Sequence, residues 1–256
     1  FMASMLEKSG VIEEVFDVAY KWLGRIPGGL AVATVVASTV LAAMVGVIGA
    51  AVVTMALVAL PSMLRRGYSP VLAVGTVMAG GTLGILIPPS VLAIVYGLVA
   101  NQSVGELYLG SVFPGLVLSG LYILFSVGYA LLNPKAAPRL SPEETPTWSE
   151  RWRALRSIWS PLVLIFLVLG TIFLGLAAPT EAAAIGAFGA MVVAAIHRRL
   201  SWTILRLALE QTAKATAMVM WIVFGANAFV GFYIAQGGDR YVSELLLGTG
   251  LSPWGI

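Results

Sequence analysis

Long apolar runs alternate with short basic clusters along this chain. Residues 26–64 and residues 67–105 each form a run of 39 residues without a charged side chain. Further predominantly apolar runs cover residues 108–132, 157–177, 182–196 and 212–235. About 20 apolar residues suffice for a helix to cross the hydrocarbon layer of a bilayer. The pattern therefore predicts an all-α polytopic membrane protein.

Basic residues flank the first of these runs on both sides. Lys21 and Arg25 precede it, and Arg65 and Arg66 follow it. Because basic residues concentrate on the cytoplasmic side of a membrane, both ends of the run are expected there. A segment of 39 residues that leaves and returns to one side predicts a re-entrant hairpin over residues 26–64, with its tip at residues 45–51. One long tilted helix and two tightly joined full spans are the alternatives.

The second run contains helix-breaking residues near its centre. Residues 79–90 read Ala-Gly-Gly-Thr-Leu-Gly-Ile-Leu-Ile-Pro-Pro-Ser. Glycine costs about 1 kcal/mol and proline about 3 kcal/mol in a helix interior, and backbone groups freed inside a membrane must line a protein-enclosed or water-filled site. A broken helix over residues 69–100 is typical of the binding site of a secondary transporter. A proline-kinked structural helix is the alternative.

Two groups of residues are candidates for binding an ion or a substrate. In the break, carbonyl and hydroxyl oxygens can replace the water around a sodium ion, and a helix N-terminus presents amides to a carboxylate. At the hairpin tip, small residues permit a tight turn and close approach to an ion, although they also serve ordinary helix packing. The candidates are Gly81, Thr82, Gly84, Pro88, Pro89 and Ser90 in the break, and Gly46, Gly49 and Ala50 at the tip.

The remaining segments suggest an internal repeat. Residues 1–25 read as the end of a membrane helix followed by an amphipathic helix over residues 11–23, which lies either along the membrane interface or packed on the protein. Residues 226–247 look similar but end on the opposite side of the membrane, which predicts an inverted repeat as in secondary transporters. Residues 1–25 are expected to precede a first-repeat transport domain at residues 26–132, which ends with a helix at residues 108–132. A proline-rich cytoplasmic linker with an interfacial helix is expected at residues 133–159, and the start of a second repeat at residues 160–256.

Composition narrows the class of protein. The chain is 59% hydrophobic and 11% charged, with a mean hydropathy of +0.94, and its net charge of +3 does not suggest nucleic acid as a partner. It has no cysteine and one histidine, His197, so the residues for thiol catalysis or an intramembrane metal hydrolase are lacking. A transporter is favoured over an enzyme, and a non-transporting membrane scaffold or channel is the alternative.

Glu181 follows a long apolar run. Its carboxylate is either a helix cap or an ion site.

Several of these segments together resemble a known family. Arg65-Arg66-Gly67-Tyr68, the run at residues 79–90, Tyr96-Gly97, and the segment Ala-Pro-Thr-Glu-Ala-Ala-Ala at residues 178–184 are similar to the large membrane subunit of TRAP (tripartite ATP-independent periplasmic) transporters. Leu6-Glu7-Lys8-Ser9-Gly10 matches the same family. Members are longer at both ends, so the chain is identified as an internal fragment that stops before a second hairpin.

The resemblance implies a function, an ion and partners. It implies a sodium-coupled importer of organic acids that alternates access by an elevator motion in a bacterial or archaeal inner membrane. It also implies a small membrane subunit and a periplasmic substrate-binding protein as partners. Sodium in that family sits at hairpin tips and adjoining broken helices, which points here to Gly46, Gly49, Gly81, Thr82 and Gly84. Many members have a serine-rich first tip, whereas this tip reads Gly-Val-Ile-Gly-Ala-Ala at residues 46–51, so its ligands would be backbone carbonyls.

Overall fold

The described part of the chain is α-helical, as the apolar pattern predicts. The computed structural model describes residues 1–46, 48–138 and 146–248. Among these, four helical segments are long and apolar enough to cross a membrane, and the bent pair Trp148–Ser157 and Trp159–Phe173, whose helices meet at 48°, forms a fifth candidate. The four segments are Pro70–Ala100, Val104–Leu132, Pro179–Ile196 and Trp202–Ala235. The prediction of an all-α polytopic membrane protein is confirmed.

Two helices that run in opposite directions form a hairpin where the re-entrant element is predicted. Helix α3 (Gly29–Val45) ends at Gly46, and α4 (Ile48–Arg65) returns beside it. Near the base, the Thr34 hydroxyl lies 3.6 Å from the Met63 sulfur, and the Leu30 amide donates to the Tyr68 hydroxyl at 3.2 Å. Burial raises the pKa of Tyr68, which keeps this hydroxyl protonated. Re-entrance itself stays a prediction, and Val47 at the tip lies outside the described residues.

The broken segment packs directly against this hairpin. Helix α5 (Pro70–Leu86) contacts both α3 and α4, and α6 (Val91–Ala100) continues the segment after four non-helical residues. Helix α7 (Val104–Leu132) then returns along α3 and α5. The break covers residues 87–90 rather than the whole of residues 79–90. Gly80, Gly81 and Gly84 keep their backbone N–H groups, so they remain within the helix, which ends at Leu86. Pro88 and Pro89 have no backbone N–H to donate, so the helix breaks before them.

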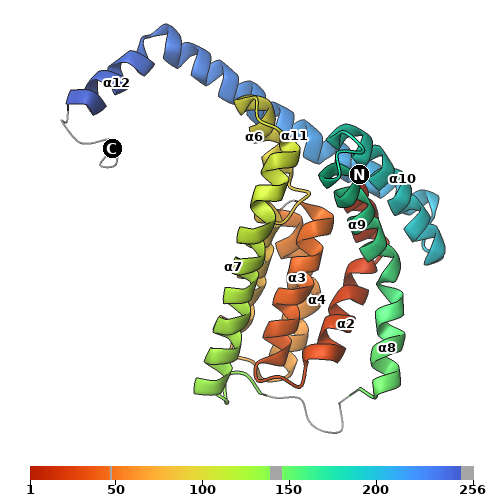
Figure 1. Ribbon diagram of the computed structural model, residues 1–256. Helices are drawn as coiled ribbons and strands as arrows, with labels where there is room; N and C mark the ends of the chain where they lie inside the picture. The colour runs from red at the N-terminus through yellow and green to blue at the C-terminus, as the bar shows by residue number, and fades with distance from the viewer. Residues whose placement is uncertain (47, 139–145, 249–256) are drawn as a thin grey trace. The chain divides into compact units, whose positions relative to one another are not determined.

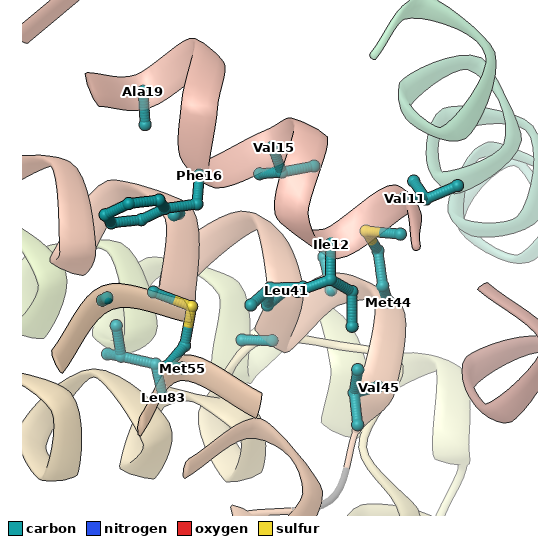
Figure 2. Packing of buried hydrophobic residues seen from close by; sticks show 14 of the residues in the cluster. Val11, Ile12, Val15, Phe16, Ala19, Leu41, Met44, Val45, Met55 and Leu83 are labelled. Atoms are coloured by element: carbon teal, nitrogen blue, oxygen red, sulfur yellow. The ribbon is translucent and has the colours of Figure 1, made fainter. Parts of the chain in front are cut away.

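The amphipathic helix is packed on the protein. Helix α1 (Met2–Lys8) leads into α2 (Val11–Leu23), whose bounds match the predicted residues 11–23. Its apolar side chains, including Ile12, Val15 and Phe16, are buried, and Figure 2 shows Ile12 beside Leu41 and Met44 of α3. This burial favours packing on the protein over a position along the membrane interface, because the apolar face is already covered.

The helices after the linker complete the first compact unit, residues 1–208. Helix α8 (Trp148–Ser157) contacts α2, and α9 (Trp159–Phe173) pairs with α10 (Pro179–Ile196), which also contacts α1 (Figure 1). Linker residues 139–145 lie outside the described residues.

The second unit covers residues 209–256 and holds most of α11 and all of α12 (Gly238–Gly248). Helix α11 (Trp202–Ala235) is continuous and includes the apolar run at residues 212–235. Its polar residues Glu210, Gln211 and Lys214 fit on one long helix without breaking the backbone. Residues 249–256 lie outside the described residues.

Candidate ion site at the hairpin tip

The hairpin tip touches the break in the neighbouring helix. Gly46 ends α3 in the left-handed conformation, with φ of 61°, and its carbonyl accepts a hydrogen bond from the Val91 amide at 3.3 Å. A side chain at position 46 would clash with the carbonyl oxygen of Pro89. Glycine is therefore required twice here, once for the positive φ and once for the close approach of two backbones.

Ser90 presents an unsatisfied hydroxyl at this junction. Its side chain is fully buried, and its Oγ has no hydrogen-bond partner among the described residues. Ser90 precedes α6 in an extended conformation but does not cap the helix with its side chain. A buried hydroxyl without a partner is costly, so within the described residues this oxygen beside the helix break is left available to a ligand.

The two prolines release backbone oxygens at the same place. In an α-helix the amides of residues 88 and 89 would donate to the carbonyls of Gly84 and Ile85, but Pro88 and Pro89 carry no N–H. The Ile87 amide still donates to the Leu83 carbonyl at 2.9 Å. The helix is thus satisfied up to Leu83, and Gly84 is the first residue whose carbonyl loses its helical donor.

Gly80 and Gly81 serve close packing in this structure. An added Cβ at Gly80 would meet the Ser38 side chain of α3, and one at Gly81 would clash with Val52 of α4. These adjacent glycines let α5 sit against both arms of the hairpin. The carbonyl of Gly81 lies inside α5, where the helix supplies its own donors.

The other predicted residues are placed as follows. The Thr82 hydroxyl donates to the Ala79 carbonyl at 2.7 Å and lies 3.4 Å from the Tyr122 hydroxyl of α7, so its partners come from neither the tip nor the break. Gly49 is exposed in α4, and a Cβ added to it would meet no atom nearby. Ala50 follows it in the same helix. The structure therefore brings Gly46, Pro89 and Ser90 together, with Gly84 and Pro88 at the end of α5 and the start of the break.

Comparison with known proteins assigns the chain to a family. Residues 1–256 match the family described as "Tripartite ATP-independent periplasmic transporter, DctM component". The chain belongs to the DctM family. It is 34% identical over 252 residues to the C4-dicarboxylate TRAP transporter large permease protein DctM of Pseudomonas aeruginosa, covering 98% of this chain and 58% of that protein.

Other DctM-family relatives are named for other substrates. The ectoine TRAP transporter large permease protein TeaC of Halomonas elongata is 29% identical over 89% of this chain and 52% of that protein. The 2,3-diketo-L-gulonate TRAP transporter large permease protein YiaN of Escherichia coli is 29% identical over 94% of this chain and 56% of that protein. The chain thus spans a little over half the length of these curated relatives.

Glu181 and the His197–Arg199 pair of this DctM-family chain have structural partners. The Glu181 carboxylate accepts a hydrogen bond from the Ala178 amide at 2.9 Å and so caps α10, which favours the cap over the ion site. His197 lies 3.0 Å from the Ser157 carbonyl and 3.4 Å from a Glu14 carboxylate oxygen. Arg199 contacts the same carboxylate at 3.4 Å. This cluster ties α2 to the end of α10.

Two buried polar residues that face residues 79–90 were not predicted from the sequence. The buried Tyr108 hydroxyl of α7 donates to the Ser90 carbonyl at 3.3 Å and so holds the break in place. Ser38 of α3 is also buried with an unpartnered Oγ, facing Gly80. The sequence does indicate a role for Tyr108, because it lies within an apolar run and a buried tyrosine hydroxyl usually finds a hydrogen-bond partner.

Proposed function

We propose that this chain is part of the membrane permease subunit of a sodium-coupled, binding-protein-dependent importer of organic acids. The observation that carries the proposal is the junction of the hairpin tip with the helix break, where Gly46 meets Val91 beside the unpartnered Ser90 hydroxyl. Membership of the DctM family supports the transporter class.

The residues at this junction fit a small cation. Hard cations prefer oxygen ligands, and in secondary transporters unwound backbone carbonyls coordinate sodium. The junction offers the Ser90 hydroxyl, the carbonyls of Gly84 and Ile85 that lack helical donors, and the second lone pair of the Gly46 carbonyl. We propose that these oxygens bind the coupling sodium ion, with Pro88 and Pro89 keeping the α5 carbonyls free. Of the predicted ligands, Gly46 and Gly84 are supported by this geometry more strongly than Gly49, Gly81 and Thr82.

Ion binding at such a junction couples two elements of the chain. The ion would draw oxygens from the hairpin and from the broken segment, so its binding stabilises the arrangement in which both are in contact. In the proposed elevator motion, this joined body would move against the rest of the transporter, in a bacterial or archaeal inner membrane. A small membrane subunit and a periplasmic binding protein are the proposed partners.

Organic acids are the proposed substrates because of what the relatives' names state. The name of the Pseudomonas aeruginosa relative states a C4-dicarboxylate as substrate, and that of the Escherichia coli relative states 2,3-diketo-L-gulonate. The amides at the start of α6 offer the positive end of a helix to a carboxylate.

Uptake by the full-length transporter tests this proposal. The permease and its small subunit are reconstituted in proteoliposomes, with the binding protein and labelled succinate as a C4-dicarboxylate outside and a sodium gradient imposed. We expect uptake that requires both the inward sodium gradient and the binding protein. Uptake that persists when potassium replaces sodium would overturn sodium coupling. Uptake that persists without the binding protein would overturn dependence on it.

A further inference from the structure

An apolar cavity lies between the amphipathic helix, the hairpin and the junction of α8 with α9. Its volume is about 350 Å³, within the range of cavities that hold small ligands. Helix α2 lines it with side chains spaced three and four residues apart, and α3 lines it with Val36, Ala37 and Val40. Leu155 of α8 and Ile158 close the third side. The lining side chains are apolar, so an occupant must present an apolar surface.

One end of this cavity carries an aromatic cluster of three tryptophans. Trp22, which lines the cavity, lies 5.6 Å from Trp148 and 5.7 Å from Trp152 between ring centroids. The indole N–H of Trp22 donates to the Arg151 carbonyl at 3.3 Å. Tryptophans gather where the apolar part of a membrane meets its headgroups. This end of the cavity is therefore expected at headgroup level, on the side of the basic cluster at Lys21 and Arg25.

Arg151 lies at the same end of the cavity, and no ion pair joins its guanidinium to another described residue. It precedes the cavity residue Leu155 by four positions, so both lie on one face of α8. Its Nε and Nη2 are buried and make no hydrogen bond among the described residues, and its guanidinium lies 5.9 Å from the Trp148 ring. The neighbouring Glu150 is occupied in capping α8 at Thr147. No carboxylate of the described residues pairs with this guanidinium, so its two shielded nitrogens can donate to an anionic ligand.

We propose that this cavity binds an acyl chain of an anionic phospholipid whose phosphate pairs with Arg151. A guanidinium matches a phosphate geometrically as well as by charge. The exposed Arg153 and Arg156 on the same helix add attraction to an anionic membrane surface. A peptide segment is a poorer occupant, because the apolar lining offers no partners for its backbone amides and carbonyls. The inference is independent of the sodium site.

Photo-crosslinking of lipids to the full-length transporter tests the proposal. Phosphatidylglycerol with a diazirine on its acyl chain is added to phosphatidylcholine vesicles that hold the permease with its small subunit, and crosslinked peptides are mapped by mass spectrometry after illumination. We expect crosslinks in residues 15–23, 36–40 and 155–158. A phosphatidylcholine probe with the same chain is expected to give fewer of them.

Two variants separate the charge from the cavity. Arg151→Gln is expected to lower phosphatidylglycerol crosslinking about five-fold, the effect of one basic residue near anionic lipid. Arg153→Gln, on the exposed side of the same helix, is the matched control, and it is expected to lower these mapped crosslinks less than Arg151→Gln because its charge stays in contact with water. Val40→Phe fills the cavity while keeping the charges, and it is expected to remove crosslinks from α2 without changing the elution volume of the complex.

Three results would overturn the proposal. The first is equal crosslinking by the two lipid probes, which would show that the headgroup charge is not recognised. The second is an equal loss in the two arginine variants, which would indicate general surface attraction. The third is the absence of lipid crosslinks in the three segments, including the case in which a protein subunit covers them.

Discussion

The carbonyl of Gly46 and the amide of Val91 form a hydrogen bond of 3.3 Å across the junction of the hairpin and the broken segment. Gly46 ends one helix, and Val91 begins another 45 residues later in the sequence. Two helix termini that would otherwise leave unsatisfied groups thus share a bond. The same contact brings the buried Ser90 hydroxyl to the hairpin tip, and the proposed ion site depends on it.

Gly46→Ala is expected to abolish sodium-driven uptake. The added methyl group would clash with the Pro89 carbonyl oxygen, and alanine is strained at a φ of 61°. Gly49→Ala is the matched control in the same hairpin, because open space surrounds that glycine in α4 and alanine favours helix by about 1 kcal/mol. Uptake in proteoliposomes measures both. Equal activity of the two variants would contradict the close contact at the tip.

Tyr108→Phe is expected to destabilise the permease by about 1 kcal/mol, the usual net value of one hydrogen bond. The variant removes the donor to the Ser90 carbonyl but keeps the buried ring. Tyr122→Phe is the control, because its hydroxyl makes only a 3.4 Å contact with the exposed Thr82. Thermal unfolding of the purified protein compares them. A larger loss of stability in the Tyr122 variant would contradict this assignment.

Much of the fold follows from local patterns in the sequence. The apolar spacing and the flanking glycines predict the bounds of α2, and the small residues at the middle of residues 26–64 predict a turn near Gly46. These features depend on neighbours within one or two helical turns. The family resemblance is likewise read from contiguous segments, and the match over residues 1–256 confirms it.

The contacts between elements could not be read in the same way. Gly80, Gly81 and Gly84 look alike in the sequence, but the first two face Ser38 and Val52 across a helix interface. Gly84 instead lies four residues before a proline. The sequence also does not tell whether the apolar face of α2 covers lipid or protein, because both are apolar. Which residues meet at the tip depends on tertiary packing.

Gly81→Ala is expected to cost about 1–3 kcal/mol of stability, the usual range for overpacking. Its Cβ would clash with Val52 of α4, whereas Gly75 in the same helix has open space and supplies the matched control, Gly75→Ala. Val52→Ala should restore part of the loss in the double variant, because the two sites are in contact. Thermal unfolding of the wild type, the two single variants at Gly81 and Val52, and the double variant measures this coupling. Strict additivity would contradict the packing role.

Glu181→Gln is expected to leave the sodium dependence of uptake unchanged. The glutamine oxygen can still accept the hydrogen bond from the Ala178 amide. Glu181→Ala removes this cap and is expected to cost about 0.5–2 kcal/mol, as for other N-terminal caps. Uptake at several sodium concentrations, together with thermal unfolding, separates the two roles. A loss of sodium dependence in the glutamine variant would instead make Glu181 an ion ligand.

Binding of radioactive sodium to the purified full-length permease complex tests the proposed ion site most directly. Ser90→Ala removes one neutral oxygen and no charge, and Ser126→Ala is the matched control, because the buried Ser126 hydroxyl already donates to the Tyr122 carbonyl at 2.8 Å. We predict saturable sodium binding in the wild type and in the Ser126 variant, and binding weakened about ten-fold in the Ser90 variant, the effect of losing roughly 1.4 kcal/mol. Unchanged sodium affinity in Ser90→Ala would contradict the site at the hairpin tip.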